Sequence, residues 1–237
     1  MIKLGRRTVN AVRYLLEDLL PSALRDSPLF LPVMYLAWGR DALRVISFRD
    51  RLRTMTPEEY AGFYARITPI HGDCDLNRPC VDRILAEVAG TTVLDAGCGR
   101  GSLARLIAGA DSERTVVGAD LAPPSGENPP NLSFVEGWLG RLPFADGSFD
   151  TVVCTHTLEH ILDIDEAVAD LRRIARRRLI LVVPREREAR YPLNLHVHFF
   201  PYAHTFLNRI RAPAGLFRCE ILHRDIYYRE DVVAAKI

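Results

Sequence analysis

Short β-branched runs alternate with helical stretches between residues 91 and 184, and this alternation constrains the fold more than any other feature of the chain. Five runs predict strands, namely TTVLDAG, RTVVGADL, NLSFVEG, FDTVVCTH and RRLILVVP. DIDEAVADLRRIA, between the last two, has its apolar residues on one face, which predicts a helix lying on the sheet. After a helix predicted at 201–210, two adjacent extended runs, LFRCEILH and IYYREDVV, predict an antiparallel pair. The predicted fold class is α/β, with a doubly wound, mostly parallel seven-stranded sheet that ends in this antiparallel pair.

The first 75 residues have apolar residues at helical spacing rather than short β-branched runs, which predicts a separate helical segment. Thr8–Leu20 carries apolar residues at helical spacing, and TPEEYAGFYARI begins with a capping box of Thr56 and Glu59. We therefore expect a helical lid, substrate or dimer segment over 1–75 and the α/β domain over 76–237. The apolar run LFLPVMYLAW favours an apolar acceptor if it faces inward, and dimerisation or shallow membrane contact if it faces outward.

Composition excludes several classes of protein. The chain has 237 residues and a formal net charge of +1, so no global field attracts nucleic acid, and no nucleic-acid partner is expected. Its five cysteines form no CxxC pair, which argues against a disulfide framework or a zinc ribbon and favours a reducing, cytoplasmic location. The most apolar run is about half the ~20 residues of a membrane helix, so no transmembrane segment is predicted.

A glycine-rich turn follows the first predicted strand, in VLDAGCGRG. Ligands of open α/β sheets bind at this position, beyond the carboxyl ends of the strands. The dinucleotide fingerprint requires a glycine where this chain has Ser102. Asp95, two residues before the first glycine, suits a ligand with a cationic amine, and Asp120 at the end of the second strand can accept hydrogen bonds from ribose hydroxyls. Together they predict an adenosine-like ligand that carries a positive charge.

The segments LDAGCGRG, GADL and LPFADGSFDTVVCTHTLEHILD resemble the class I S-adenosylmethionine-dependent methyltransferases, in particular the branch with the ubiquinone-type and small-molecule enzymes. The resemblance covers roughly residues 80–184 and implies a Rossmann-like fold and S-adenosylmethionine as cofactor, with S-adenosylhomocysteine as product. It further implies a set of cofactor-binding residues: Asp95, Gly97, Cys98, Gly99, Gly101, Asp120, Leu121, Gly137, Trp138, Leu139, Thr155 and His156.

Within this set, the resemblance implies that Asp95 and the backbone of the turn hold the methionine part, while Asp120 takes the ribose. Similar proteins commonly carry an aspartate for the adenine amine where this chain has Trp138. Trp138 either covers the adenine ring or fills core volume, and the sequence leaves both open.

The stretch HTLEH matches the zinc-protease pattern H-x-x-E-H, which needs both histidines on one helix face and a third distant ligand. His156 instead follows a predicted strand, so we expect the stretch to form a wall of the cofactor and substrate cleft, and no metal site is predicted. A base is needed where the acceptor loses a proton, and histidine suits that role. The candidates are His156, His160, His196 and His198.

The predicted activity is methyl transfer to oxygen of a small molecule, glycan or glycolipid acceptor by in-line displacement. C-methylation of a quinone-like ring is the first alternative. A catalytically silent cofactor-binding scaffold and an enzyme using NAD or a nucleotide sugar on the same fold remain open as well.

Overall fold

A computed structural model describes residues 19–52, 54–56, 58–60, 62–63, 76–191 and 193–232 of the chain. The chain divides into two compact units. Residues 1–69 and 186–201 form the first, called the helical unit below, and residues 70–185 and 202–237 form the second, called the sheet unit. The predicted helix over Thr8–Leu20 lies, apart from its last two residues, outside the described part of the chain.

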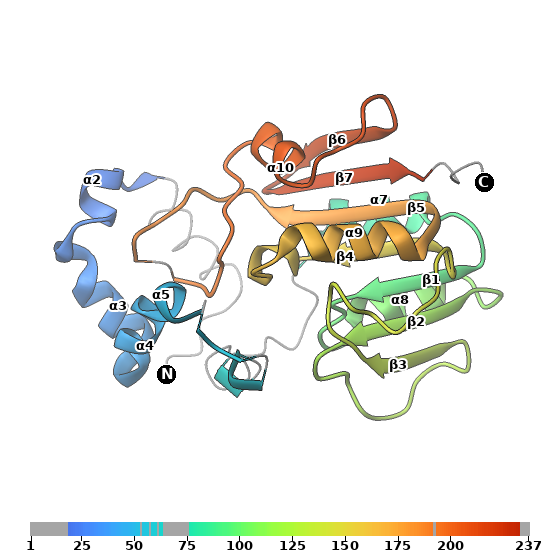
Figure 1. Ribbon diagram of the computed structural model, residues 1–237, viewed down its shortest axis with the longest axis horizontal. Helices are drawn as coiled ribbons and strands as arrows, with labels where there is room; N and C mark the ends of the chain where they lie inside the picture. Colours follow the sequence, from blue (N-terminus) through green and yellow to red (C-terminus); the bar gives the residue numbers. More distant parts are fainter. Residues whose placement is uncertain are drawn as a thin grey trace. The chain divides into compact units, whose positions relative to one another are not determined.

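The sheet unit contains a seven-stranded sheet in the order β3-β2-β1-β4-β5-β7-β6 (Figure 1). Strands β1 to β5 run parallel, whereas β7 is antiparallel to both β5 and β6. The strands are β1 (Thr92–Ala96), β2 (Thr115–Asp120), β3 (Leu132–Glu136), β4 (Phe149–Thr155), β5 (Ala175–Pro184), β6 (Phe217–Leu222) and β7 (Asp225–Asp231). The predicted fold class, including the antiparallel pair, is confirmed.

Helices cover both faces of this sheet. They are α7 (Arg78–Glu87), α8 (Ser102–Ala110), η4 (Leu158–His160), α9 (Ile164–Ile174) and α10 (Ala203–Arg209). Helix α9 lies over one face, and α7 and α8 lie over the other (Figure 1). The apolar side chains of α7 and α8 pack on Val93, Val153 and Ile180 of the strands in one buried cluster.

The central strands read as continuous apolar runs because they are covered on both faces. All but the last residue of β4 are buried, as are the last six residues of β5. In register, Ala96 of β1 pairs with Ala119 of β2 and Cys154 of β4. The carboxyl ends of β1, β2 and β4 therefore meet at one edge of the sheet.

The helical unit contains short helices. These are α2 (Ser22–Arg25), η2 (Pro28–Phe30), α3 (Leu31–Trp38), η3 (Gly39–Asp41), α4 (Ala42–Ile46) and α5 (Phe48–Leu52). The capping box is confirmed, since the Thr56 N–H donates to Glu59 and the Glu59 N–H donates to Thr56 Oγ1. No described helix has the length and apolar character that spanning a membrane requires.

The apolar run over 29–38 buries only two of its side chains, Phe30 and Met34. Leu29 and Leu36 are 75% and 85% exposed, and Tyr35 is 47% exposed. The lid, dimer and membrane roles stay predictions.

Residues 186–201 follow β5 and group with the N-terminal helices. Arg49 of α5 connects them, since its Nη1 donates to the Ala189 carbonyl at 2.9 Å and its guanidinium lies 4.4 Å from the centre of the Phe199 ring. Arg25, which is 3% exposed, donates to the Glu188 carbonyl. Both arginines are therefore structural residues of the helical unit.

Candidate cofactor site

The glycine turn after β1 is shaped by left-handed backbone that favours glycine. Gly97, Gly99 and Gly101 have φ angles of 73°, 53° and 73°. The Gly97 N–H donates to the Ala119 carbonyl at 2.8 Å, which fastens the turn to the end of β2. A Cβ on Gly97 would come within 2.4 Å of Thr157 Oγ1, whereas a Cβ on Gly99 would meet nothing within 4 Å. The backbone at Gly99 is thus open to close approach by a ligand.

Asp95 is the buried acid of this turn. Its side chain lies at the end of β1 with 1% exposure, and its Oδ2 has no hydrogen-bond partner among the described residues. Burial raises the pKa of Asp95 to about 7, the Ala104 N–H lowers it by a smaller effect, and the nearby Asp120 carboxylate adds to the rise. A buried carboxylate with an unused oxygen is costly unless a donor or a cation reaches it.

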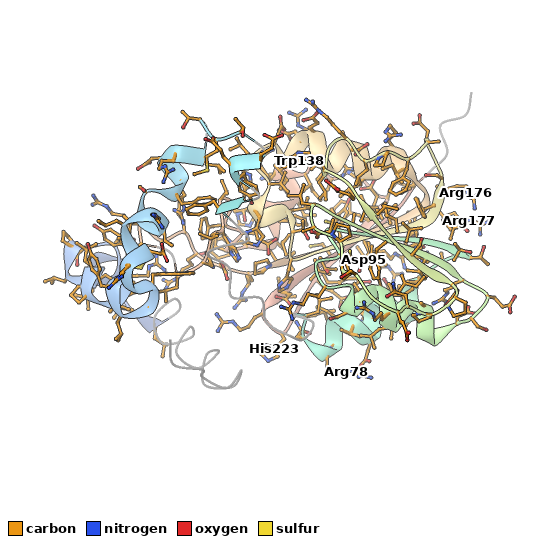
Figure 2. The ribbon with its side chains drawn as sticks, turned by 90° about the horizontal axis from the view of Figure 1, so that it is seen from below. Arg78, Asp95, Trp138, Arg176, Arg177 and His223 are labelled. Atoms are coloured by element: carbon orange, nitrogen blue, oxygen red, sulfur yellow. The ribbon has the colours of Figure 1, made fainter. Side chains whose placement is uncertain are left out.

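The arginines at the start of β5 pair with a different buried carboxylate, Asp150. Figure 2 shows Asp95 within the sheet unit and Arg176 and Arg177, at the start of β5, at its periphery. Those two arginines pair instead with Asp150 at 2.6 and 3.0 Å. Asp150 also accepts N–H bonds from the loop before β1, so this second buried carboxylate is satisfied by the fold itself.

Asp120 ends β2, as predicted. Its Oδ2 accepts the Gly99 N–H at 2.8 Å and its Oδ1 accepts the Ala122 N–H at 3.1 Å. Each carboxylate oxygen keeps a further lone pair, so the side chain is oriented by the backbone and retains capacity to accept hydroxyl protons. This geometry suits a ribose with two adjacent hydroxyls.

The predicted adenine side consists of residues after β2 and β3. Leu121 is 36% exposed and Leu139 is 7% exposed. The Gly137 N–H donates to the Asp120 carbonyl at 3.0 Å, which holds the two strand ends together. Trp138 next to it is half-buried, and Figure 2 shows it at the surface of the sheet unit. Whether Trp138 covers an adenine ring stays a prediction.

One aromatic side chain, Phe134, and one thiol, Cys98, pack under the turn. A Cβ on Gly101 would come within 2.3 Å of the Phe134 ring, which also lies against Gly118 of β2. Cys98 packs beside the same strand, and burial raises the pKa of its thiol, with smaller contributions from Asp95 and Asp120. Cys98 is therefore a neutral filler of the turn rather than a nucleophile.

Thr155 and His156 lie at the end of β4. The two histidines of the HTLEH stretch lie on different elements. His156 directly follows the strand with a left-handed φ of 49°, whereas His160 ends the short helix η4. The two histidines do not share a helix face, which is what the zinc-protease pattern requires. Thr157, between them, donates to the Gly97 carbonyl at 3.3 Å and so links the loops after β1 and β4.

The other two predicted histidines belong to the helical unit. His196 is 8% exposed, and its Nδ1 lies 2.6 Å from Glu186 Oε2. Asn194 also donates to that oxygen at 3.1 Å. His198 is half-buried, with its ring 6.3 Å from that of Phe200. Sequence reasoning missed Glu186, because a carboxylate ten residues away carries no local signal of contact with an imidazole.

Comparisons with known proteins agree with this fold. Residues 94–183 match a family described as "Methyltransferase domain". A probable S-adenosylmethionine-dependent methyltransferase of Mycolicibacterium smegmatis is 36% identical over 98 residues, which is 40% of this chain and 37% of that protein. A demethylmenaquinone methyltransferase of Thermus thermophilus is 29% identical over 145 residues, which is 56% of this chain and 66% of that protein. The chain thus matches less than two thirds of either relative.

Among solved structures, an S-adenosylmethionine-dependent methyltransferase from Aquifex aeolicus superimposes with a TM-score of 0.50 at 16% identity. The match covers 76% of this chain and all of that one, and at this identity it shows the shared fold. The sheet order and the glycine turn after β1 are those of the Rossmann-like class of α/β proteins. Within that class, residues 94–183 match the methyltransferase domain family, and the relatives found are methyltransferases, including S-adenosylmethionine-dependent ones.

Proposed function

We propose that the chain binds S-adenosylmethionine at the carboxyl edge of the sheet and transfers its methyl group to a proton-bearing acceptor. The observation that carries the proposal is Asp95, whose buried Oδ2 lacks a partner among the described residues. A cationic amine would satisfy that oxygen and favour the ionised carboxyl. Asp120 would hold the ribose, and Gly99 leaves room for the ligand against the backbone.

When bound, the cofactor supplies an activated methyl group on a sulfonium. The chain then has to hold the acceptor in line, exclude water and take up a proton where the acceptor loses one. His156 and His160 of the sheet unit are the proposed bases. For His196 and His198 the role of base stays a prediction from the sequence. The same arrangement serves transfer to oxygen or to carbon.

Two acceptor classes follow from different observations. A hydroxyl of a small molecule, glycan or glycolipid is the first, because a histidine base assists most when a hydroxyl must lose its proton. A quinone-like ring is the second, and the name of the Thermus thermophilus relative, a demethylmenaquinone methyltransferase, supports it. The partner is in both cases a small or lipid-like molecule.

Equilibrium binding tests the cofactor assignment. S-adenosylmethionine and S-adenosylhomocysteine should bind the full chain in the micromolar range, while NAD should not bind, and Asp120→Ala should weaken binding. Tight NAD binding without any response to the two sulfur compounds would overturn the assignment. Labelled methyl donor, incubated with pools of sugars, phenols and reduced quinones, then identifies the acceptor. Binding without transfer to any pool would favour a silent scaffold.

A further inference from the structure

His156 has a backbone conformation that the fold imposes. Among described residues other than glycine, only His156, Arg211 and His223 have positive φ angles. Such backbone is uncommon outside glycine and tends to occur where a side chain must be aimed at a functional site. The His156 N–H donates to the Val182 carbonyl of β5 at 2.9 Å, which fixes the residue at the edge where β1 and β4 end.

The imidazole of His156 lies at ion-pair distance from Asp225, the first residue of β7. His156 Nε2 lies 3.3 Å from Asp225 Oδ1, and the two side chains are 22% and 7% exposed. Asp225 pairs in register with Pro184 at the end of β5, so the antiparallel strand delivers this carboxylate to the carboxyl edge of the parallel strands. All of these residues belong to the sheet unit.

Asn77, in turn, fixes the carboxylate. Its Nδ2 donates to Asp225 Oδ2 at 2.6 Å and to the Leu222 carbonyl at 3.1 Å. Its Oδ1 accepts the Cys80 N–H at 3.0 Å and so caps helix α7. Both ends of the amide are therefore engaged, and Asn77 cannot turn without uncapping the helix.

A carboxylate close to one imidazole nitrogen favours, through its charge, the tautomer with the proton on that nitrogen. We propose that Asp225, held by Asn77, is a positioning residue that keeps His156 in the Nε2–H tautomer and so makes Nδ1 the base for the acceptor. This inference rests on the proposed function and adds to it which histidine acts and what orients it. Neither Asp225 nor Asn77 lies in a motif of the sequence.

The proton of the step passes from the acceptor to His156. His156 Nδ1 takes the proton of the acceptor as the acceptor atom forms its bond to the methyl carbon. The carbon–sulfur bond breaks with its electron pair on sulfur, which becomes a neutral thioether. The positive charge moves to the imidazolium of His156, where Asp225 stands 3.3 Å away to stabilise it.

Three variants separate this role from a structural one. Asp225→Asn keeps the shape of the side chain but removes its charge. His156→Asn removes the imidazole and keeps a residue that tolerates left-handed backbone. Asn77→Ser keeps a helix cap and removes the donor to Asp225. His223→Asn is the matched control, because His223 is an exposed histidine with a φ of 61° in the turn before β7, and Figure 2 shows it on the surface.

Nitrogen-15 NMR of the histidine rings in the full chain is the first readout, since it requires no acceptor. The parent should show the Nε2–H tautomer at His156, and Asp225→Asn and Asn77→Ser should shift that population towards Nδ1–H. Calorimetry should give affinities for S-adenosylmethionine within about twofold of the parent for Asp225→Asn, Asn77→Ser and His223→Asn. Methyl transfer to reduced 1,4-naphthoquinone should fall about a hundredfold or more in kcat in Asp225→Asn and His156→Asn, with little change in KM.

The double variant of Asp225→Asn and His156→Asn should lose no more than His156→Asn alone, because the two residues act as a unit. An Nδ1–H tautomer in the parent, or an unchanged tautomer in both Asp225→Asn and Asn77→Ser, overturns the inference. A parent that binds no S-adenosylmethionine refutes the proposed function instead. If Asp225→Asn fails to fold, the parent tautomer and Asn77→Ser decide.

Discussion

Binding of S-adenosylmethionine should strengthen about tenfold between pH 6 and pH 8, because Asp95 ionises in that interval. Burial raises its pKa to about 7, so about one tenth of the free protein carries the anion at pH 6 and about nine tenths at pH 8. Only the anion attracts a cationic amine. The tenfold change in the ionised fraction corresponds to about 1.4 kcal/mol of binding free energy.

The same shift predicts that Asp95→Asn stabilises the protein without ligand. The pKa of Asp95 is raised from 3.8 to about 7 on folding, so the folded state keeps its proton over a range where the unfolded state has lost it. Relative to the ionised carboxyl, the protonated carboxyl stabilises the folded state, and this stabilisation is fully present below pH 3.8. It is lost as the pH rises through 7, where the buried carboxyl ionises. The stability gain of Asp95→Asn should grow from near zero at pH 4 to at most about 4 kcal/mol at pH 8.

Isothermal titration calorimetry in two buffers of different ionisation enthalpy measures both the affinity and the protons released. At pH 7 the parent should release about half a proton from Asp95 on binding. Asp95→Asn should bind more weakly at pH 8 and lose this component, which isolates it from titration of the amine of the ligand. Asp150→Asn is the control, because Asp150 is a buried carboxylate near the start of β4, whereas Asp95 lies near the carboxyl end of β1. This variant should leave binding unchanged. An equal pH slope in Asp95→Asn and the parent would refute the reasoning.

Other variants test the turn, the sheet and the helical unit. Gly97→Ala places an alanine in left-handed backbone, which costs about 1–2 kcal/mol, and its Cβ would clash with Thr157. The unfolding temperature and the cofactor affinity should both fall further than in Gly99→Ala, whose Cβ meets nothing within 4 Å. Burial alone would raise the pKa of Asp150, but hydrogen bonds from the Arg176 side chain and from backbone N–H groups outweigh it and lower the pKa to about 2. The ionised carboxyl therefore stabilises the fold above pH 3.8, and this stabilisation is lost as the pH falls towards 2. Acid unfolding of Asp150→Asn should lack this component. Thr56→Ala should cost about 1 kcal/mol of unfolding free energy by loss of the cap, measured by denaturant titration.

Much of the fold could be predicted because its signals are local. The continuous apolar runs of β4 and β5 and the apolar face of α9 each lie within about a dozen residues, so period and flanking residues suffice. The carboxyl edge follows from parallel pairing alone, and with it the proximity of Asp95 to Asp120. The outward exposure of Leu36 could not be predicted, because α3 is apolar on nearly all sides and its pattern does not indicate which face is buried.

The residues that orient the site are a different matter, because their contacts depend on the closure of the whole sheet. Asp225 reaches His156 only once β7 has inserted between β5 and β6 in its register, across 69 residues of chain. Asn77 reaches Asp225 only when α7 packs on the face that β7 completes. In the sequence, Asp225 reads as a turn residue and Asn77 as a helix cap, and both descriptions hold in the structure. The additional role arises because one carboxylate that begins an antiparallel strand is placed at the edge where the parallel strands end. Strand β7 lies between β5 and β6 and runs antiparallel to both. Its insertion there is therefore what brings a fixed negative charge to the candidate base.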